Sequence, residues 1–151
     1  MPEVKKILLP VVFSEYDTLA ADYARQWAGC TGAEVDLVHV TPDLDFFMGH
    51  EAALQSIHKD FKGYEKEVAE KLMHAFAEKV LPGVSIRSRV VLRGNAADEI
   101  LRYARENDIQ MIVMATHCRK GLESMFVGSV AERVIKKAHC PVLAVHPPCP
   151  V

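Results

Sequence analysis

Five apolar segments of strand length alternate with four helical patterns along this chain of 151 residues. The segments expected as strands are 6–12, 34–40, 84–92, 109–115 and 140–146. The first of them, KILLPVV, is apolar almost throughout, which is typical of a strand buried on both faces of a sheet. This alternation predicts an open α/β fold, in which helices cover both faces of a parallel sheet through right-handed crossovers. Half of the residues are hydrophobic, which suits a single domain spanning residues 1–151.

Several residues mark where the predicted helices begin and end. Ser14 is a natural N-cap for the first helix, and Gly32 is a natural end for it. Asn95 is the expected N-cap of the third helix. The long second helix carries apolar residues three or four positions apart, with Glu67, Glu70 and Glu78 on its outer face. Its apolar residues are Phe61, Tyr64, Val68, Leu72, Phe76 and Val80.

The composition excludes several classes of protein. A net charge of −2 lacks the basic excess of a general nucleic-acid binder. No apolar run approaches the roughly 18 residues that span a membrane, and the apolar run near the N-terminus is too short for a signal peptide. Four irregularly spaced cysteines without a CxxC pair indicate reduced thiols and a cytoplasmic protein.

One segment, MATHCRKGLESMFVGSVAERV at residues 114–134, has the layout of a phosphate-binding turn. An apolar strand leads into a basic loop, and Gly128 and Ser129 then open an amphipathic helix, whose dipole favours an anion. Ala115 and Cys118 stand where such a turn usually has its first glycines.

The chain resembles the universal stress protein domain over nearly its whole length. The resemblance is carried, in order, by KILLPVVFSEYDTLAADYARQWA, VDLVHVTP, VLRGNAADEILRYARENDIQMIVMATHCRKG and VGSVAERVIKKAHCPVLAVH. It implies a Rossmann-like sheet with strand order 3-2-1-4-5. Ligands of such sheets bind where the order reverses, which here lies between the first and fourth strands, at residues 11–14 and 114–129.

The resemblance also implies a nucleotide site, and this chain departs from its pattern in two places. ATP-binding members carry G-x2-G-x9-G-[S/T], whereas this chain has Ala115, Cys118, Gly128 and Ser129 at those positions. They usually have an Asp at the position of Val12, followed by a small residue where Phe13 stands. We therefore expect a degenerate nucleotide site. Its candidate residues are Pro10, Val12, Val40, Met114, Ala115, His117, Cys118, Gly128, Ser129 and Val130.

The retained features leave two interpretations of this loop open. Thr116, His117, Arg119 and Lys120 provide donors and positive charge, and Val40 and Met114 are placed to flank an adenine ring. Alternatively, the two basic residues form a solvated loop and Gly128 serves packing. We expect a dimeric stress-response binding or signalling module without catalytic turnover. The alternative is a universal stress protein that binds ATP, with slow hydrolysis or phosphate transfer.

Cys118 suggests a third function, that of a thiol redox sensor. A thiol near basic residues and a helix N-terminus has a lowered pKa and a raised reactivity. A metal site that also used His39 and His146 lacks the required spacing of ligands, so the simpler interpretation is that Cys118 replaces a glycine. No serine-centred G-x-S-x-G elbow occurs, and no carboxylate pair or triad is evident.

Two further segments suggest contacts with partners. Phe46, Phe47 and Met48 form an apolar cluster that is expected to cover the cleft, to bind a partner or to pack against the long helix. The fifth strand is expected at a sheet edge, and the resemblance implies dimerisation through it. We therefore predict a homodimer with Val142, Leu143 and Val145 at the centre of the interface, and Pro147 and Pro148 ending the ladder.

Overall fold

A five-stranded parallel sheet with the order β3-β2-β1-β4-β5 forms the centre of the molecule. The computed structural model describes residues 2–43, 52–116 and 128–148, and for residues 52–58 it describes the backbone alone. The elements are β1 (Lys6–Pro10), α1 (Glu15–Thr31), β2 (Glu34–Thr41), α2 (Ala52–Val80), β3 (Ile86–Arg93), α3 (Ala96–Glu106), β4 (Met111–Ala115), α4 (Ser129–Lys137) and β5 (Val142–Val145). The predicted fold class and strand order are confirmed.

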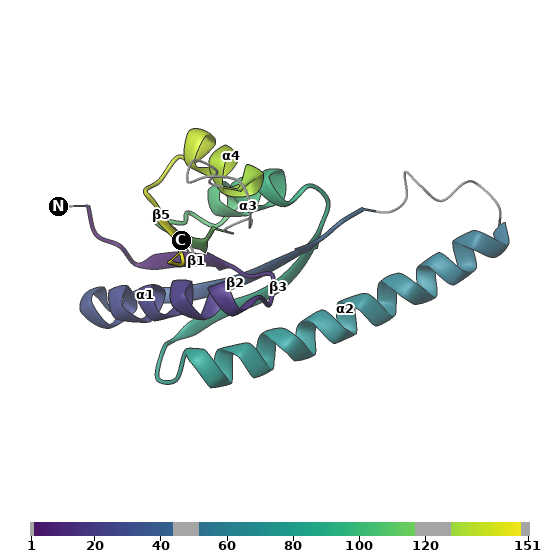
Figure 1. The fold of residues 1–151 in the computed structure, drawn as a ribbon, viewed down its shortest axis with the longest axis horizontal. Helices are drawn as coiled ribbons and strands as arrows, with labels where there is room; N and C mark the ends of the chain where they lie inside the picture. The colour runs from purple at the N-terminus through teal and green to yellow at the C-terminus, as the bar shows by residue number, and fades with distance from the viewer. Residues whose placement is uncertain (1, 44–51, 117–127, 149–151) are drawn as a thin grey trace.

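The helices form one layer on each side of the sheet, as Figure 1 shows: α1 and α2 lie on one face, and α3 and α4 on the other. Successive residues of a strand point to opposite faces, so Ile7 and Leu9 pack with α1, whereas Leu8 packs with α3 and α4. All three side chains are fully buried. Burial on both faces explains why the first strand is apolar almost throughout.

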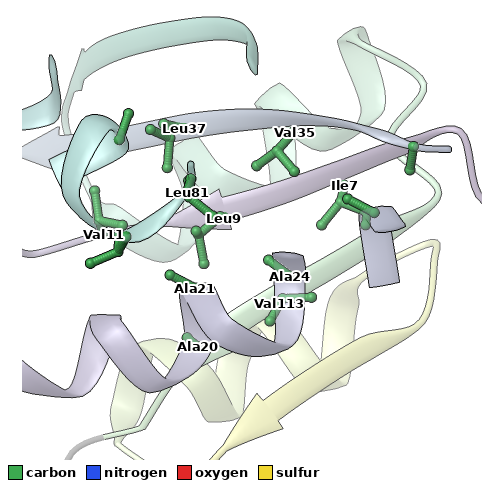
Figure 2. Close-up of a cluster of buried hydrophobic side chains, with 14 of the residues drawn as sticks. Ile7, Leu9, Val11, Ala20, Ala21, Ala24, Val35, Leu37, Leu81 and Val113 are labelled. Carbon is green, nitrogen blue, oxygen red and sulfur yellow. The ribbon is translucent and has the colours of Figure 1, made fainter. Parts of the chain in front are cut away.

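Helix α1 packs on the sheet through alanines. Ala20, Ala21 and Ala24 lie against the strands in the close-up of this core (Figure 2), and none of the three is exposed to solvent. The helical spacing of Tyr23 and Trp27 with Ala20 and Ala24 predicts one shared apolar face, but the two rings are 42% and 40% exposed. Small side chains let the helix approach the sheet closely, and the larger rings remain at its margin. Gly32 ends α1 in the left-handed conformation as predicted, with φ of 72°.

The helices of the other face follow the prediction more closely. The helical spacing of apolar residues predicts an inner face of α3, and all four of its members are buried: Ala97, Ile100, Leu101 and Ala104. The predicted N-cap is also present, since Asn95 Oδ1 accepts a hydrogen bond of 3.1 Å from the N–H of Asp98. In α4, Ala131 and Val134 are buried, whereas Ile135 is 44% exposed.

Helix α2 differs most from its predicted pattern. Its buried residues are Ala69, Met73, Ala77 and Val80. Four members of the predicted apolar row are instead exposed to solvent, with exposed fractions of 50%, 68%, 37% and 45%: Phe61, Tyr64, Val68 and Leu72. The amino-terminal part of α2 projects past the sheet (Figure 1). Farther along the helix Ala69 and Met73 are buried, so the neighbouring Val68 and Leu72 lie on its outer side.

Candidate functional site

A cavity of about 460 Å³ lies at the carboxyl ends of β1 and β4. These two strands are neighbours, but the chain then turns to opposite faces, into α1 after β1 and into α4 after β4. Divergence of this kind leaves a crevice at the point where the strand order reverses. The topology inferred from the sequence therefore matches the position of the cavity.

Eight of the ten candidate site residues are in the described part of the chain, and all eight line this cavity. They are Pro10, Val12, Val40, Met114, Ala115, Gly128, Ser129 and Val130. His117 and Cys118, together with Arg119 and Lys120, lie outside the described residues. The structure thus brings together residues that are more than 100 positions apart in the sequence.

Seven further residues line the cavity that were not among the ten candidates. They are Val11, Asp17, Val38, Ala96, Ile100, Thr116 and Ala131. Val11 and Thr116 fall within the two segments where a ligand was expected from the sequence. Ala96 and Ile100 come from α3, and no sequence motif connects that helix with the site. The walls are therefore largely hydrocarbon, and Asp17 is the one ionisable side chain among the described lining residues.

The turn between β1 and α1 is closed by the carboxylate of Asp17. Asp17 Oδ2 accepts hydrogen bonds from the backbone N–H groups of Val12, at 2.9 Å, and of Ser14, at 3.0 Å. The Asp17 residue is only 2% exposed. Asp17 stands three residues after Ser14, a capping-box spacing that was a usable signal for the bond to the Ser14 N–H. That spacing gave no sign of the second bond, to the N–H of Val12.

Phe13 adopts an unusual backbone conformation between these two N–H groups. Its φ of 61° lies in the left-handed region, which is uncommon for a bulky residue. Its ring stands over the imidazole of His39, with ring centroids 4.7 Å apart and planes at 42°. His39 Nδ1 donates to the carbonyl oxygen of Val11, 2.8 Å away, which ties the ends of β1 and β2 together.

Gly128 sits at the N-cap of α4 without a packing reason to be glycine. Its φ is −47°, which any residue adopts, and a Cβ placed on it meets no described atom within 4 Å. Within the described part of the chain, the interpretation of Gly128 as a packing glycine therefore finds no support. Gly128 lines the cavity, and a side chain added there would enter open space among the described residues.

Thr116 links the cavity wall to the last strand. Its backbone N–H donates to the carbonyl of Val145 at 2.9 Å, and its hydroxyl lies 2.5 Å from His146 Nδ1. Thr116 is 3% exposed. The end of β5 is thus held against the same segment that forms the wall of the cavity.

A second polar cluster lies in the half of the sheet away from the cavity. Asp36 of β2 is buried and pairs with Arg87 of β3, and its carboxylate also accepts a hydrogen bond of 3.0 Å from the Tyr103 hydroxyl of α3. The hydrogen bond to Asp36 raises the pKa of Arg87, and burial raises the pKa of Tyr103. This network joins β2, β3 and α3, and none of its three residues lines the cavity.

The remaining candidates from the sequence have these outcomes. No group of three or more His, Cys, Asp or Glu side chains is placed to hold a metal within residues 2–43, 52–116 and 128–148. No described helix is long and apolar enough to cross a membrane. Cys30 is exposed, and burial raises the pKa of the half-buried Cys140 thiol. Cys118 and the cluster of Phe46, Phe47 and Met48 lie outside the described residues.

Comparisons with known proteins agree on one family. The model of the "Universal stress protein family" matches residues 3–146. Universal stress protein MJ0531 of Methanocaldococcus jannaschii is 38% identical over 146 residues, which cover 95% of this chain and 83% of that protein. The solved structure of MJ0577 superposes with a TM-score of 0.83 at 26% identity and covers 99% of this chain and 100% of that one. The structure of the universal stress protein from Archaeoglobus fulgidus in complex with dAMP shares the fold, with a TM-score of 0.60 at 23% identity, and covers 95% and 98% of the two chains.

Proposed function

Because this chain belongs to the universal stress protein family, we propose that it is a dimeric stress-response binding module with a degenerate nucleotide site. In this proposal the cavity binds the nucleoside part of an adenine nucleotide and holds the phosphates weakly. The module senses or relays the presence of this ligand and does not turn it over.

The lining of the cavity is the observation that carries this proposal. A volume of about 460 Å³ falls in the range of small-molecule sites, which are mostly apolar with a few polar groups. Val40, Met114 and Val130 offer hydrocarbon to the faces of a flat base. The related protein from Archaeoglobus fulgidus was solved with dAMP, which supports a ligand of the same class here.

Three features of the site weaken the binding of a nucleotide. The Val12 side chain cannot accept a hydrogen bond from a ligand hydroxyl, which lowers the affinity for the nucleoside part. Cys118 brings a side chain to a position where glycine would let backbone N–H groups approach phosphate. Asp17 also contributes a carboxylate to the cavity wall.

A second candidate function keeps ATP as the ligand, with slow hydrolysis or phosphate transfer. The retained Gly128 and Ser129 at the start of α4 favour it, since helix N-termini bind anions. The third candidate, a redox sensor that uses Cys118, stays a prediction from the sequence.

Calorimetric titration of the purified protein with adenosine, AMP and ATP tests the proposal. We expect the three affinities to agree within about tenfold, which corresponds to about 1.4 kcal/mol, and ATP to bind more weakly than micromolar. Binding of ATP at micromolar concentration or below would establish the second candidate instead. The nucleotide proposal would be refuted if none of the three ligands bound in titration and none was found in a denatured extract of the protein as purified.

Two variants sharpen this test. The triple variant Val12→Asp, Phe13→Gly, Cys118→Gly restores the family pattern and should raise the affinity for ATP. Gly128→Val adds a side chain where the described structure has open space. The Gly128→Val protein should therefore keep the wild-type melting temperature and lose the ligand. Unchanged binding by both variants would show that the ligand occupies another place.

A further inference from the structure

We infer that Asp17 is the residue that determines selectivity against phosphate in this cavity, because its carboxylate occupies the place where an anionic ligand would bind. The inference deepens the function proposed above, and its claim about nucleosides rests on that function. Its claim about anions rests on the geometry of the turn alone.

The turn between β1 and α1 has the form of an anion-binding concavity. The N–H groups of Val12 and Ser14 flank a residue in the left-handed conformation and converge on one oxygen. Successive N–H groups in turns of this kind make concavities that bind anions. The turn also opens α1, whose dipole adds to the attraction for negative charge.

In this protein the concavity is already filled from within. Oδ2 of Asp17 accepts both hydrogen bonds, at 2.9 Å and 3.0 Å, and the Asp17 residue is 98% removed from solvent. A phosphate oxygen that used these donors would have to displace the carboxylate and leave it buried without those hydrogen bonds. A neutral nucleoside needs no such displacement, so Asp17 favours it over its phosphorylated forms.

A simple capping role for Asp17 makes different predictions. Acidic residues at the third helical position commonly bond the N-cap N–H, and removing one lowers stability. Capping alone does not require the carboxylate to line a cavity or to bind the N–H of Val12, which lies outside the helix. The two roles are separated by whether an anion gains access when Asp17 is removed.

The experiment follows the backbone amide signals of Val12 and Ser14 by NMR while inorganic pyrophosphate is added. In the wild-type protein we expect no saturable shift of either signal. In Asp17→Ala both donors become free, so both signals should shift saturably, with an affinity at least about tenfold above that of the wild type. Asp17→Asn keeps an acceptor oxygen in place and should resemble the wild type.

Asp98 provides the matched control. It occupies the same third position in α3, also bonds its N-cap residue through its N–H, and is half-exposed and paired with Arg133. Asp98→Ala changes the net charge equally and should leave the Val12 and Ser14 signals insensitive to pyrophosphate. If Asp98→Ala or Asp17→Asn gained as much pyrophosphate binding as Asp17→Ala, net charge would control anion access. Occupancy of the turn by the Asp17 side chain would then not control it.

Other results would overturn the inference directly. Saturable shifts of Val12 and Ser14 in the wild type would show that the concavity is open, and this result does not depend on the folding of any variant. If the folded Asp17→Ala protein showed no saturable shift of these signals with pyrophosphate, Asp17 would have a capping role only. In calorimetry, Asp17→Ala should raise the affinity for ATP about tenfold relative to adenosine. If the wild type binds no nucleoside and the Asp17→Ala variant still gains pyrophosphate binding, the proposed function is refuted. The claim about anions is then retained.

Discussion

Phe13 shows how one residue can combine backbone strain with a packing role. A left-handed conformation costs a residue with a side chain about 1–2 kcal/mol, and Phe13 holds a φ of 61°. The contact of its ring with His39 offsets part of that cost, since tilted aromatic pairs stabilise by about 0.5–1.5 kcal/mol. The same conformation lets Val12 and Ser14 direct their N–H groups at Asp17.

Substitution of Phe13 separates these two contributions. Phe13→Ala loses the ring and keeps the strain, whereas Phe13→Gly loses the ring and relieves the strain. We expect Phe13→Gly to be more stable than Phe13→Ala by about 1 kcal/mol, measured by urea unfolding of both proteins. If the alanine variant were the more stable one, the left-handed conformation of this residue would be in doubt.

At the scale of elements, the length of α2 decides which of its residues are buried. Its 29 residues extend for about 43 Å at the usual helical rise, whereas the 8 residues of β2 extend for about 26 Å. The helix must therefore project past the sheet. The row from Phe61 to Leu72 lies partly on this projection and turns away from the sheet, while smaller residues such as Ala69 and Ala77 make the contact.

Two neighbouring residues of α2 test this orientation. Met73 is 1% exposed, so Met73→Ala should lower the free energy of unfolding by about 2–5 kcal/mol. Leu72 is 45% exposed, so Leu72→Ala should lower it by less than about 1 kcal/mol. Chemical denaturation of both variants under the same conditions would measure these two changes in the free energy of unfolding. A larger loss at Leu72 than at Met73 would restore the orientation that the apolar spacing suggested.

At the scale of the whole molecule, β5 remains a candidate for assembly. It lies at one edge of the sheet and pairs only with β4 among the described strands, and an unpaired edge favours association. Leu143 is half-buried, whereas Val145 is 6% exposed and belongs to the core of its own subunit. In the predicted homodimer, Leu143 is therefore available to contact the partner, whereas Val145 mainly stabilises its own subunit.

Lysine substitutions distinguish these parts. Leu143→Lys should keep the fold and give monomers, because a charge at the two-fold edge opposes pairing of the strands. Val145→Lys should unfold the protein, because it buries an unpaired charge. Sedimentation and circular dichroism report the two effects. A wild-type monomer at tens of micromolar, where a dimer with a Kd of about 1 μM is mostly assembled, would contradict the prediction.

The sequence by itself determined the fold class, the strand order through the resemblance, and most of the wall of the cavity. The fold class follows from periodicity and chain order, because alternating strands and helices specify a parallel sheet. The position of the crevice follows from the reversal of strand order, which the resemblance implies. The candidates at the ends of the first and fourth strands therefore needed no knowledge of side-chain packing. The caps at Gly32 and Asn95 are local for the same reason, since each depends on residues within one helical turn.

Only the tertiary structure decided which apolar residues are buried and what fills the turn before α1. Burial depends on how far the neighbouring layer reaches, which is why α2 and the rings of α1 departed from their predicted faces. The contribution of Ala96 and Ile100 to the cavity depends on how α3 crosses the sheet. The capping-box spacing of Ser14 and Asp17 accounts for the bond to the Ser14 N–H. The bond to the Val12 N–H depends on the left-handed conformation of Phe13, which no spacing in the sequence encodes.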